Sequence, residues 1–218
     1  MDRRLARMID HTFLGAAGDA ESVRRLCREA KRCGFAAVCV NPAEVPLAAR
    51  LLKSSRVAVA TVVGFPLGQN TTRIKCAEAL DAIESGAREL DFVVNERLLK
   101  FDPQACFAEL KALIAAVRSS PRPQTVTKLI LECCNLTPAE MIRGARLAKR
   151  AGFDFVKTST GFGAHGATVA DVRRLRRAVG AQMGVKAAGG IRDRESALAL
   201  VAAGADRLGT SAGPKLVR

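Results

Sequence analysis

The feature that most constrains this chain is a regular alternation of short β-branched runs with longer stretches of helical periodicity. The short runs predict strands at Ile9–Thr12, Ala37–Val40, Val57–Val63, Leu90–Val94, Lys128–Glu132, Phe153–Lys157, Met183–Ala187 and Arg207–Gly209. The longer stretches predict helices at Glu21–Cys33, Ala43–Lys53, Thr72–Ser85, Pro103–Val117, Pro138–Ala151, Thr168–Val179 and Glu195–Ala203. Strictly alternating strands and helices favour a parallel sheet, and this number of units over 218 residues predicts a closed (β/α)₈ TIM barrel.

Similar phrases mark the same step in four of these units. Each phrase ends a helix on a glycine and begins the next strand, as in Arg32-Cys-Gly-Phe35 and Arg150-Ala-Gly-Phe153. No linker or low-complexity segment separates the units, so residues 1–218 are expected to form a single barrel domain.

Composition points to the cytoplasm. The N-terminus carries no apolar core of the kind that a secretory signal needs, and the longest apolar stretch, Val57–Leu67, is too short to cross a bilayer. The seven cysteines form no CxxC pair and fit a reducing compartment. Their spacing also matches no zinc site, so we expect neither a metal nor another cofactor.

The net charge of +14 has two interpretations. One is nucleic-acid binding or the steering of an anionic substrate. The other is an arginine-rich solvent face on amphipathic helices, which we favour because the basic residues are spread along helical segments. Aromatic residues make up only 4% of the chain, which leaves few platforms for base stacking.

Lys157 is the strongest candidate for chemistry. It ends an apolar run and opens the stretch Lys157-Thr-Ser-Thr-Gly-Phe-Gly163. A lysine in this setting is placed to be desolvated, and both burial and a neighbouring cation lower a lysine pKa. The resulting free amine can attack a carbonyl to form a Schiff base. Lys186, in Val185-Lys-Ala-Ala-Gly-Gly-Ile191, has the same setting one unit later and can supply that cation.

The barrel interpretation brings further polar residues to the same edge. The carboxyl ends of barrel strands form the catalytic mouth, and phosphate binds in the loops after the last two strands. Strand ends here offer Asp10, Cys39, Asp91 and Glu132 as well as the two lysines, and Gly189, Gly190, Gly209 and Ser211 occupy the phosphate position. Glycine N–H groups form an anion site without any cationic side chain.

The chain resembles the deoxyribose-phosphate aldolases, a family of class I (Schiff-base) aldolases. The resemblance spans nearly the whole chain, and its phrases include Ile9-Asp-His-Thr12, Val63-Gly-Phe-Pro-Leu-Gly68, Leu90-Asp-Phe-Val93, Lys157–Gly163, Gly184–Arg192 and Gly209-Thr-Ser211. It implies reversible cleavage of 2-deoxy-D-ribose 5-phosphate to D-glyceraldehyde 3-phosphate and acetaldehyde.

The same resemblance implies roles for three of the candidate residues. Lys157 is expected to form the Schiff base, with Lys186 and Asp91 as the groups that handle protons. From their residue types and their places at the barrel mouth, the expected substrate-binding set comprises Asp10 on a hydroxyl group, Cys39 on the pocket wall, Thr160 as a pocket donor, Gly161, and the phosphate turns at Gly189, Gly190, Gly209 and Ser211.

Two other functions remain open on the sequence. One is another class I aldolase or transaldolase with a different pair of aldehydes. The other is a basic protein that binds a phosphosugar or a nucleic acid without catalysis.

The last unit predicts a homodimer. A helix that starts near Ala212 has only about seven residues, which gives roughly 10 Å of helix. The apolar outer face of the unit is then left partly bare unless the first helix or a second subunit covers it, and exposed apolar patches commonly mark interfaces.

Overall fold

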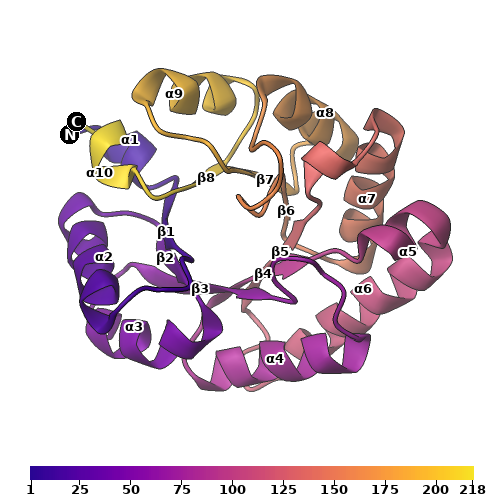
Figure 1. Ribbon diagram of the computed structural model, residues 1–218, viewed down its shortest axis with the longest axis horizontal. Helices are drawn as coiled ribbons and strands as arrows, with labels where there is room; N and C mark the ends of the chain where they lie inside the picture. The colour runs from indigo at the N-terminus through magenta and orange to yellow at the C-terminus, as the bar shows by residue number, and fades with distance from the viewer.

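The computed structural model describes residues 1–218, and its eight strands close into one barrel in sequence order. Every neighbouring pair is parallel, including the closing pair between the first strand and the last. Figure 1 shows the strands around the central axis and the helices outside them. The strands are β1 (Ile9–Phe13), β2 (Ala37–Val40), β3 (Ala58–Val63), β4 (Glu89–Val93), β5 (Val126–Ile130), β6 (Phe155–Lys157), β7 (Gly184–Ala188) and β8 (Arg207–Thr210).

The helices form an outer ring whose apolar faces meet the strands. Their ends follow the expected chemistry: Thr137 and Glu140 form a capping box at the start of α7, and Gly34 ends α2 in a left-handed conformation. The α-helices are α1 (Arg3–Ala6), α2 (Ala20–Cys33), α3 (Val45–Leu52), α4 (Thr72–Glu84), α5 (Glu96–Phe101), α6 (Pro103–Arg118), α7 (Pro138–Ala151), α8 (Val169–Val179), α9 (Arg194–Ala202) and α10 (Gly213–Leu216). None of these helices is long and apolar enough to cross a membrane.

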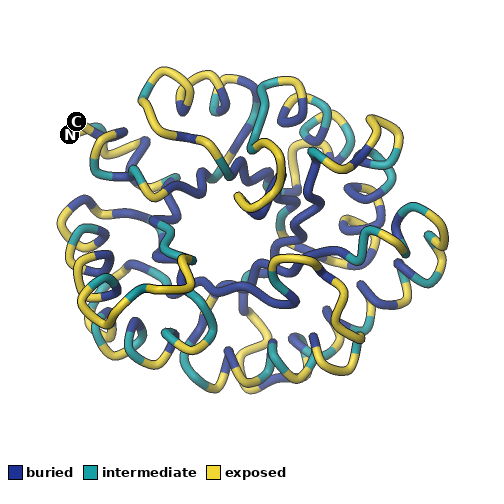
Figure 2. Tube along the Cα trace, in the orientation of Figure 1, coloured by how far each residue is buried: buried dark blue, intermediate teal, exposed yellow.

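The hydrophobic core lies between the strands and the helix ring. One cluster of buried apolar residues runs through most units, and Figure 2 shows the buried segments facing inward with exposed segments outside. Inside the barrel, by contrast, only a small separate apolar cluster occurs, made by Ala37, Cys39, Ala60 and Val62. Charged side chains occupy much of the remaining interior, and they form the site described below.

The predicted barrel is confirmed, with strand boundaries that mostly shift by one or two residues. The fifth strand is Val126–Ile130 rather than Lys128–Glu132, which places Glu132 in a turn beyond the strand. The sixth begins at Phe155 rather than Phe153, because the Phe153 N–H bonds back to Ala148 in the preceding helix. Sequence periodicity missed two short helices, α1 and α5.

The apolar outer face of the last unit is not left bare. The expectation of a bare face, on which the predicted homodimer depended, is therefore wrong. Leu216 and Val217 are buried, and the Asp2 N–H donates to the Val217 carbonyl at 2.9 Å. Arg194 joins the two chain ends, because its guanidinium donates to Asp2 Oδ2 at 2.7 Å and to the Leu216 carbonyl at 3.0 Å. The N-terminal segment of the same chain therefore covers the shortened final unit.

Candidate active site

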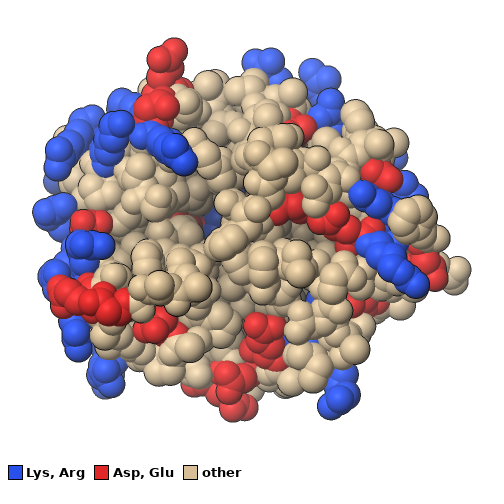
Figure 3. Space-filling model, viewed as in Figure 1, with Lys and Arg blue, Asp and Glu red and all other residues tan.

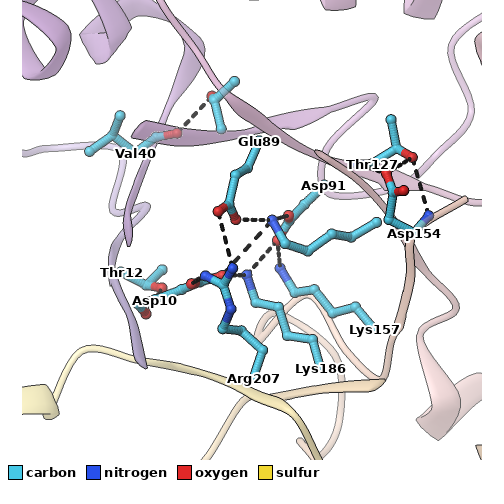
Figure 4. A network of polar contacts seen from close by, with 12 residues as sticks. Asp10, Thr12, Val40, Glu89, Asp91, Thr127, Asp154, Lys157, Lys186 and Arg207 are labelled. Atoms are coloured by element: carbon cyan, nitrogen blue, oxygen red, sulfur yellow. Dashed lines mark hydrogen bonds and ion pairs between the residues drawn. The ribbon is translucent and has the colours of Figure 1, made fainter. Parts of the chain in front are cut away.

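A network of ion pairs fills the barrel interior where TIM barrels usually hold layers of branched apolar side chains. The strands supply it because alternate residues of each strand point inward. Figure 4 shows the converging side chains. The members of the network are Asp10, Glu89, Asp91, Lys128, Lys157, Lys186 and Arg207.

Asp91 lies at the centre of this network and accepts from three lysines. Its Oδ1 is 2.8 Å from Lys128 Nζ, and its Oδ2 is 2.8 Å from Lys157 Nζ and 2.7 Å from Lys186 Nζ. Burial alone would raise the pKa of Asp91, but the three ammonium groups outweigh it and hold the pKa well below its usual range. Asp91 is therefore an anion that links two neighbouring amines through a single oxygen.

Lys157 and Lys186 occupy paired positions on adjacent strands but differ in charge environment. Burial, followed by repulsion from Lys186, lowers the pKa of Lys157, although Asp91 acts in the opposite direction. Burial also disfavours the charged form of Lys186, but Asp10 and Asp91 outweigh it and raise the pKa of Lys186. Lys186 has the second carboxylate because its Nζ lies 2.5 Å from Asp10 Oδ2. Lys157 is thus the amine that most readily loses its proton.

The floor of the barrel consists of fully paired charges. Arg207 donates to Asp10 and, at 3.1 Å, to Glu89, while Lys128 Nζ is 2.7 Å from the second Glu89 oxygen. Burial would raise the pKa of Asp10, but Lys186, Arg207 and Lys128 lower it to about 2. These groups lie beneath the two strand lysines and fix the positions of their carboxylate partners.

Lys157 opens onto a cavity of about 330 Å³ at the mouth of the barrel. The wall of this cavity is formed by Thr12–Gly15, Lys157, Thr160–Phe162, Ala188–Arg192 and Gly209–Ser211. A cavity of about 450 Å³ lies elsewhere, among the arginines of α7 and α8, but none of the buried lysines reaches it. We therefore place the candidate active site by its chemistry, at the smaller cavity.

Glycines supply much of the cavity wall. Gly161, Gly189 and Gly190 all have positive φ angles, which residues other than glycine rarely adopt. Gly189 also packs backbone to backbone, because an added Cβ would lie 2.9 Å from the Gly166 Cα. A Cβ on Gly190 would meet nothing within 4 Å, so this turn is open toward the cavity. Such turns expose N–H groups that can bind an anion.

The predicted site residues divide into two groups. Lys157, Thr160, Gly161, Gly189, Gly190, Gly209 and Ser211 line the cavity. Asp10, Asp91 and Lys186 are fully buried behind Lys157 and do not line it. Cys39 is also fully buried and lies in the small apolar cluster inside the barrel; burial first, and then Asp91, raise the pKa of its thiol to about 11.

Sequence reasoning missed Glu89, Lys128 and Arg207 in the network and Arg192 on the cavity wall. Glu89 could have been found by period-two alternation, since it precedes Asp91 by two residues and points to the same face. Lys128 pairs with Asp91 in the register of β4 and β5, and one sequence does not supply that register. Arg192 was visible in the glycine phrase but was not selected.

Basic side chains gather around the rim of the face shown in Figure 3, mainly over the outer helices. The exposed arginines of the helices include Arg24 in α2, Arg150 in α7, and Arg173 and Arg177 in α8. The middle of the same face is mostly uncharged, with a few acidic groups. On this face the basic side chains therefore lie mainly over the helix ring and not over the middle.

Comparison with known proteins gives one consistent result. A family model described as DeoC/LacD family aldolase matches residues 4–214. A deoxyribose-phosphate aldolase of Thermoanaerobacter sp. (strain X514) is 49% identical over 214 residues, which cover 98% of this chain and 95% of the relative. The corresponding enzyme of Bacteroides thetaiotaomicron is 49% identical over 215 residues, which cover 98% and 89% of the two chains.

Solved structures agree with the sequence comparison. The tetrameric deoxyribose phosphate aldolase of Aeropyrum pernix superposes with a TM-score of 0.91 at 36% identity and covers 99% of this chain and 90% of its own. Fold, family model and relatives all give the same assignment, so the protein is an aldehyde-forming lyase. The chain belongs to the DeoC/LacD family of aldolases.

Proposed function

We propose that this aldolase reversibly cleaves 2-deoxy-D-ribose 5-phosphate to D-glyceraldehyde 3-phosphate and acetaldehyde through a Schiff base on Lys157. One observation carries the proposal. Of the three lysines that contact Asp91, Lys157 alone lines the cavity and alone has a lowered pKa. The relatives named above support the substrate, because they carry the name of deoxyribose-phosphate aldolase.

The reaction proceeds by covalent catalysis. The neutral Lys157 amine attacks the C1 aldehyde of the open-chain sugar, and loss of water gives a protonated imine. The imine withdraws the electron pair of the C2–C3 bond as the C3 hydroxyl loses its proton, which releases glyceraldehyde 3-phosphate and leaves an enamine. Protonation of the enamine at C2 and addition of water then release acetaldehyde and restore the amine.

Asp91 and Lys186 handle the protons of these steps. Asp91 Oδ2 lies between the two amines, at 2.8 Å from Lys157 Nζ and 2.7 Å from Lys186 Nζ. Carboxylates and lysines within hydrogen-bond reach of a reacting group act as general acids and bases. Asp10 and Asp91 stabilise the charged form of Lys186, and this charge in turn favours the neutral form of Lys157.

The phosphate binds at the turns on the other side of the cavity. Gly161, Gly189, Gly190, Gly209 and Ser211 line that wall, and their backbone N–H groups are the donors proposed for the phosphate. Arg192 lines the same wall and adds a guanidinium, which binds phosphate well.

Borohydride reduction in the presence of acetaldehyde, followed by peptide mass mapping, tests the proposal. A stable ethyl group on Lys157 is expected. A label on Lys186 would reverse the two roles, and the absence of any labelled lysine would rule out the Schiff-base mechanism. Substrate profiling on phosphorylated and unphosphorylated sugars separates deoxyribose-phosphate aldolase from an aldolase with another pair of aldehydes.

We also propose a homodimer in a reducing, cytoplasmic environment. All seven cysteines are free thiols in the structure, which is typical of that compartment. Phe101 at the end of α5 is 81% exposed and offers an apolar contact. Light scattering coupled to size exclusion distinguishes a dimer from a monomer and from the tetramer named for the Aeropyrum pernix relative.

A further inference from the structure

Glu132 has a backbone conformation that is costly for its residue type. It follows β5 with φ 53° and ψ 66°, and it is the only residue other than glycine with a positive φ. A side chain in the left-handed region is strained, and such strain persists only where surrounding contacts enforce it. The strain at Glu132 therefore needs contacts that hold its side chain in place.

The Glu132 carboxylate is also buried without a cation. The residue is 5% exposed, and no lysine, arginine or histidine lies within ion-pair distance of it. Its hydrogen-bond donors are instead the neighbouring Cys134 thiol, at 3.6 Å from Oε1, and one residue across the cavity rim. Thr160 donates its N–H to the two carboxylate oxygens at 3.4 and 3.3 Å, and it donates its hydroxyl to Oε2.

The bonded residue begins the segment that forms one wall of the cavity. Thr160, Gly161 and Phe162 all line the cavity beside Lys157. The Phe162 N–H donates to Thr160 Oγ1 at 3.0 Å, so the same hydroxyl also fixes the next turn of the loop. Figure 2 shows this exposed loop curling toward the barrel axis. There the Phe162 ring meets Phe65 from the loop after β3, with centroids 5.3 Å apart and planes at 87°.

Packing on the far side keeps the carboxylate in place. Gly163 lies so close that an added Cβ would be 2.6 Å from Cys134 Sγ and 3.0 Å from Glu132 Cδ. Backbone bonds tie the two loops together as well, since the Cys133 N–H donates to the Thr158 carbonyl at 2.8 Å. The turn after β5 and the loop after β6 are thus one unit, joined through Glu132.

We propose that Glu132 is a positioning residue that holds Thr160–Phe162 as the substrate-facing wall of the cavity. This inference deepens the proposed function and rests on it. The Thr160 hydroxyl donates a hydrogen bond to Glu132 and accepts one from the Phe162 N–H. One lone pair of the hydroxyl oxygen is then left free. Thr160 can therefore accept a hydrogen bond from a hydroxyl group of the substrate but cannot donate one, so the wall selects a sugar hydroxyl over a carbonyl oxygen.

The test compares Glu132→Ala and Glu132→Gln with the control Glu140→Gln. Glu140 caps α7 eight residues further along and does not contact the cavity wall, so it reports only the loss of a glutamate. For Glu132→Ala we expect the KM for 2-deoxyribose 5-phosphate to rise about tenfold, whereas the control stays near wild type. Glu132→Gln keeps one acceptor oxygen and should give a smaller rise of about threefold.

Borohydride trapping of acetaldehyde on Lys157 provides the second measurement. Acetaldehyde has no sugar hydroxyls or phosphate, so its trapping rate in Glu132→Ala should stay within about twofold of wild type. If Glu132→Ala left the KM unchanged, or if its trapping rate fell by the same factor as its KM rose, the inference would be overturned. If wild type itself shows no trapping, the proposed function fails instead, and the two failures are distinguished.

Thr160→Val covers the case in which Glu132→Ala does not fold. It removes the same hydroxyl contact from the other side, and we expect a similar rise in KM, of about tenfold. The double variant of Glu132→Gln and Thr160→Val should show no further rise over Thr160→Val alone. Additive losses would show that Glu132 acts independently of Thr160, which contradicts the proposal.

Discussion

The mouth and the floor of this barrel use the same residue types to opposite effect. On the floor, Lys128 contacts both Glu89 and Asp91, and burial is outweighed, so its pKa is raised. At the mouth, Lys157 has Asp91 as its one carboxylate partner and shares it with two other ammonium groups. There burial dominates and the pKa of Lys157 is lowered. The number of carboxylates around each buried lysine, and not burial alone, separates a structural cation from the proposed nucleophile.

The position of the cavity follows the same division. The cavity reaches Lys157 but neither Lys128 nor Lys186. A carbonyl compound that enters from the mouth therefore meets the lysine whose pKa is lowered, which is the proposed nucleophile. The paired charges below favour the ionised form of Asp91 beside that lysine.

The largest expected effect is the loss of Lys157. Both Lys157→Ala and Lys157→Arg should lower kcat by about four orders of magnitude or more, because neither side chain can form the imine. Arginine keeps a positive charge beside Asp91, so its failure would show that chemistry, and not the ion pair, is lost. Steady-state kinetics with circular dichroism measure both points. Retained activity in either variant would mean that another lysine of the network is the nucleophile.

Lys186 should have the next largest effect. Its removal in Lys186→Met takes away a repulsive ammonium and leaves Asp91 with fewer cations, and both changes raise the pKa of Lys157. Because the neutral amine is the reactive form, the acid limb of the pH–rate profile should move to higher pH by about one unit, which alone lowers the rate at neutral pH by about tenfold. Loss of the proton-transfer role proposed for Lys186 should bring the total fall to about 100-fold. Lys186→Arg keeps the charge and should leave the limb in place. An unmoved limb in Lys186→Met would remove Lys186 from the tuning of Lys157.

Asp10 tests the floor through folding stability. Its pKa is lowered from 3.8 to about 2, so its contribution to stability is present above pH 3.8 and is lost as the pH falls through about 2. The stability advantage of wild type over Asp10→Asn should therefore shrink by about 2 kcal/mol as the pH falls from 5 to 2. Urea unfolding across this range measures the difference. A gap that does not depend on pH would mean that the Asp10 charge does not stabilise the floor.

The sequence predicted most of the fold because its signals are local. Helix ends on glycine, caps such as Thr137, and short β-branched runs repeat in each unit and require no knowledge of distant residues. The sequence did not predict that the N-terminal segment covers the last unit. This packing joins Asp2 to Val217, a contact between the two ends of the chain that local periodicity does not report.

The candidate site was predicted less evenly. The lysines and glycines were found because they lie at strand ends next to glycine phrases, where a barrel places its mouth. Lys128 and Arg207 were missed because an inward charge in mid-barrel is recognised only with the register of neighbouring strands. The role of Glu132 depends on a left-handed turn and on a contact with Thr160, 28 residues later, and neither is visible in the sequence.

The smallest expected effect concerns the open phosphate turn at the mouth. Gly190 has φ +75° and nothing within 4 Å of an added Cβ, so Gly190→Ala introduces backbone strain and places a methyl group toward the cavity. Gly34 has nearly the same φ, +69°, and the same open surroundings, but it ends α2 far from the cavity wall. Gly34→Ala is therefore a matched control for strain.

We expect Gly190→Ala to raise the KM for 2-deoxyribose 5-phosphate by about tenfold and to leave the KM for unphosphorylated deoxyribose nearly unchanged. Gly34→Ala should lower the melting temperature to a similar extent while both KM values stay constant. If both substrates lost affinity equally in Gly190→Ala, the turn would shape the mouth in general and would not bind the phosphate group.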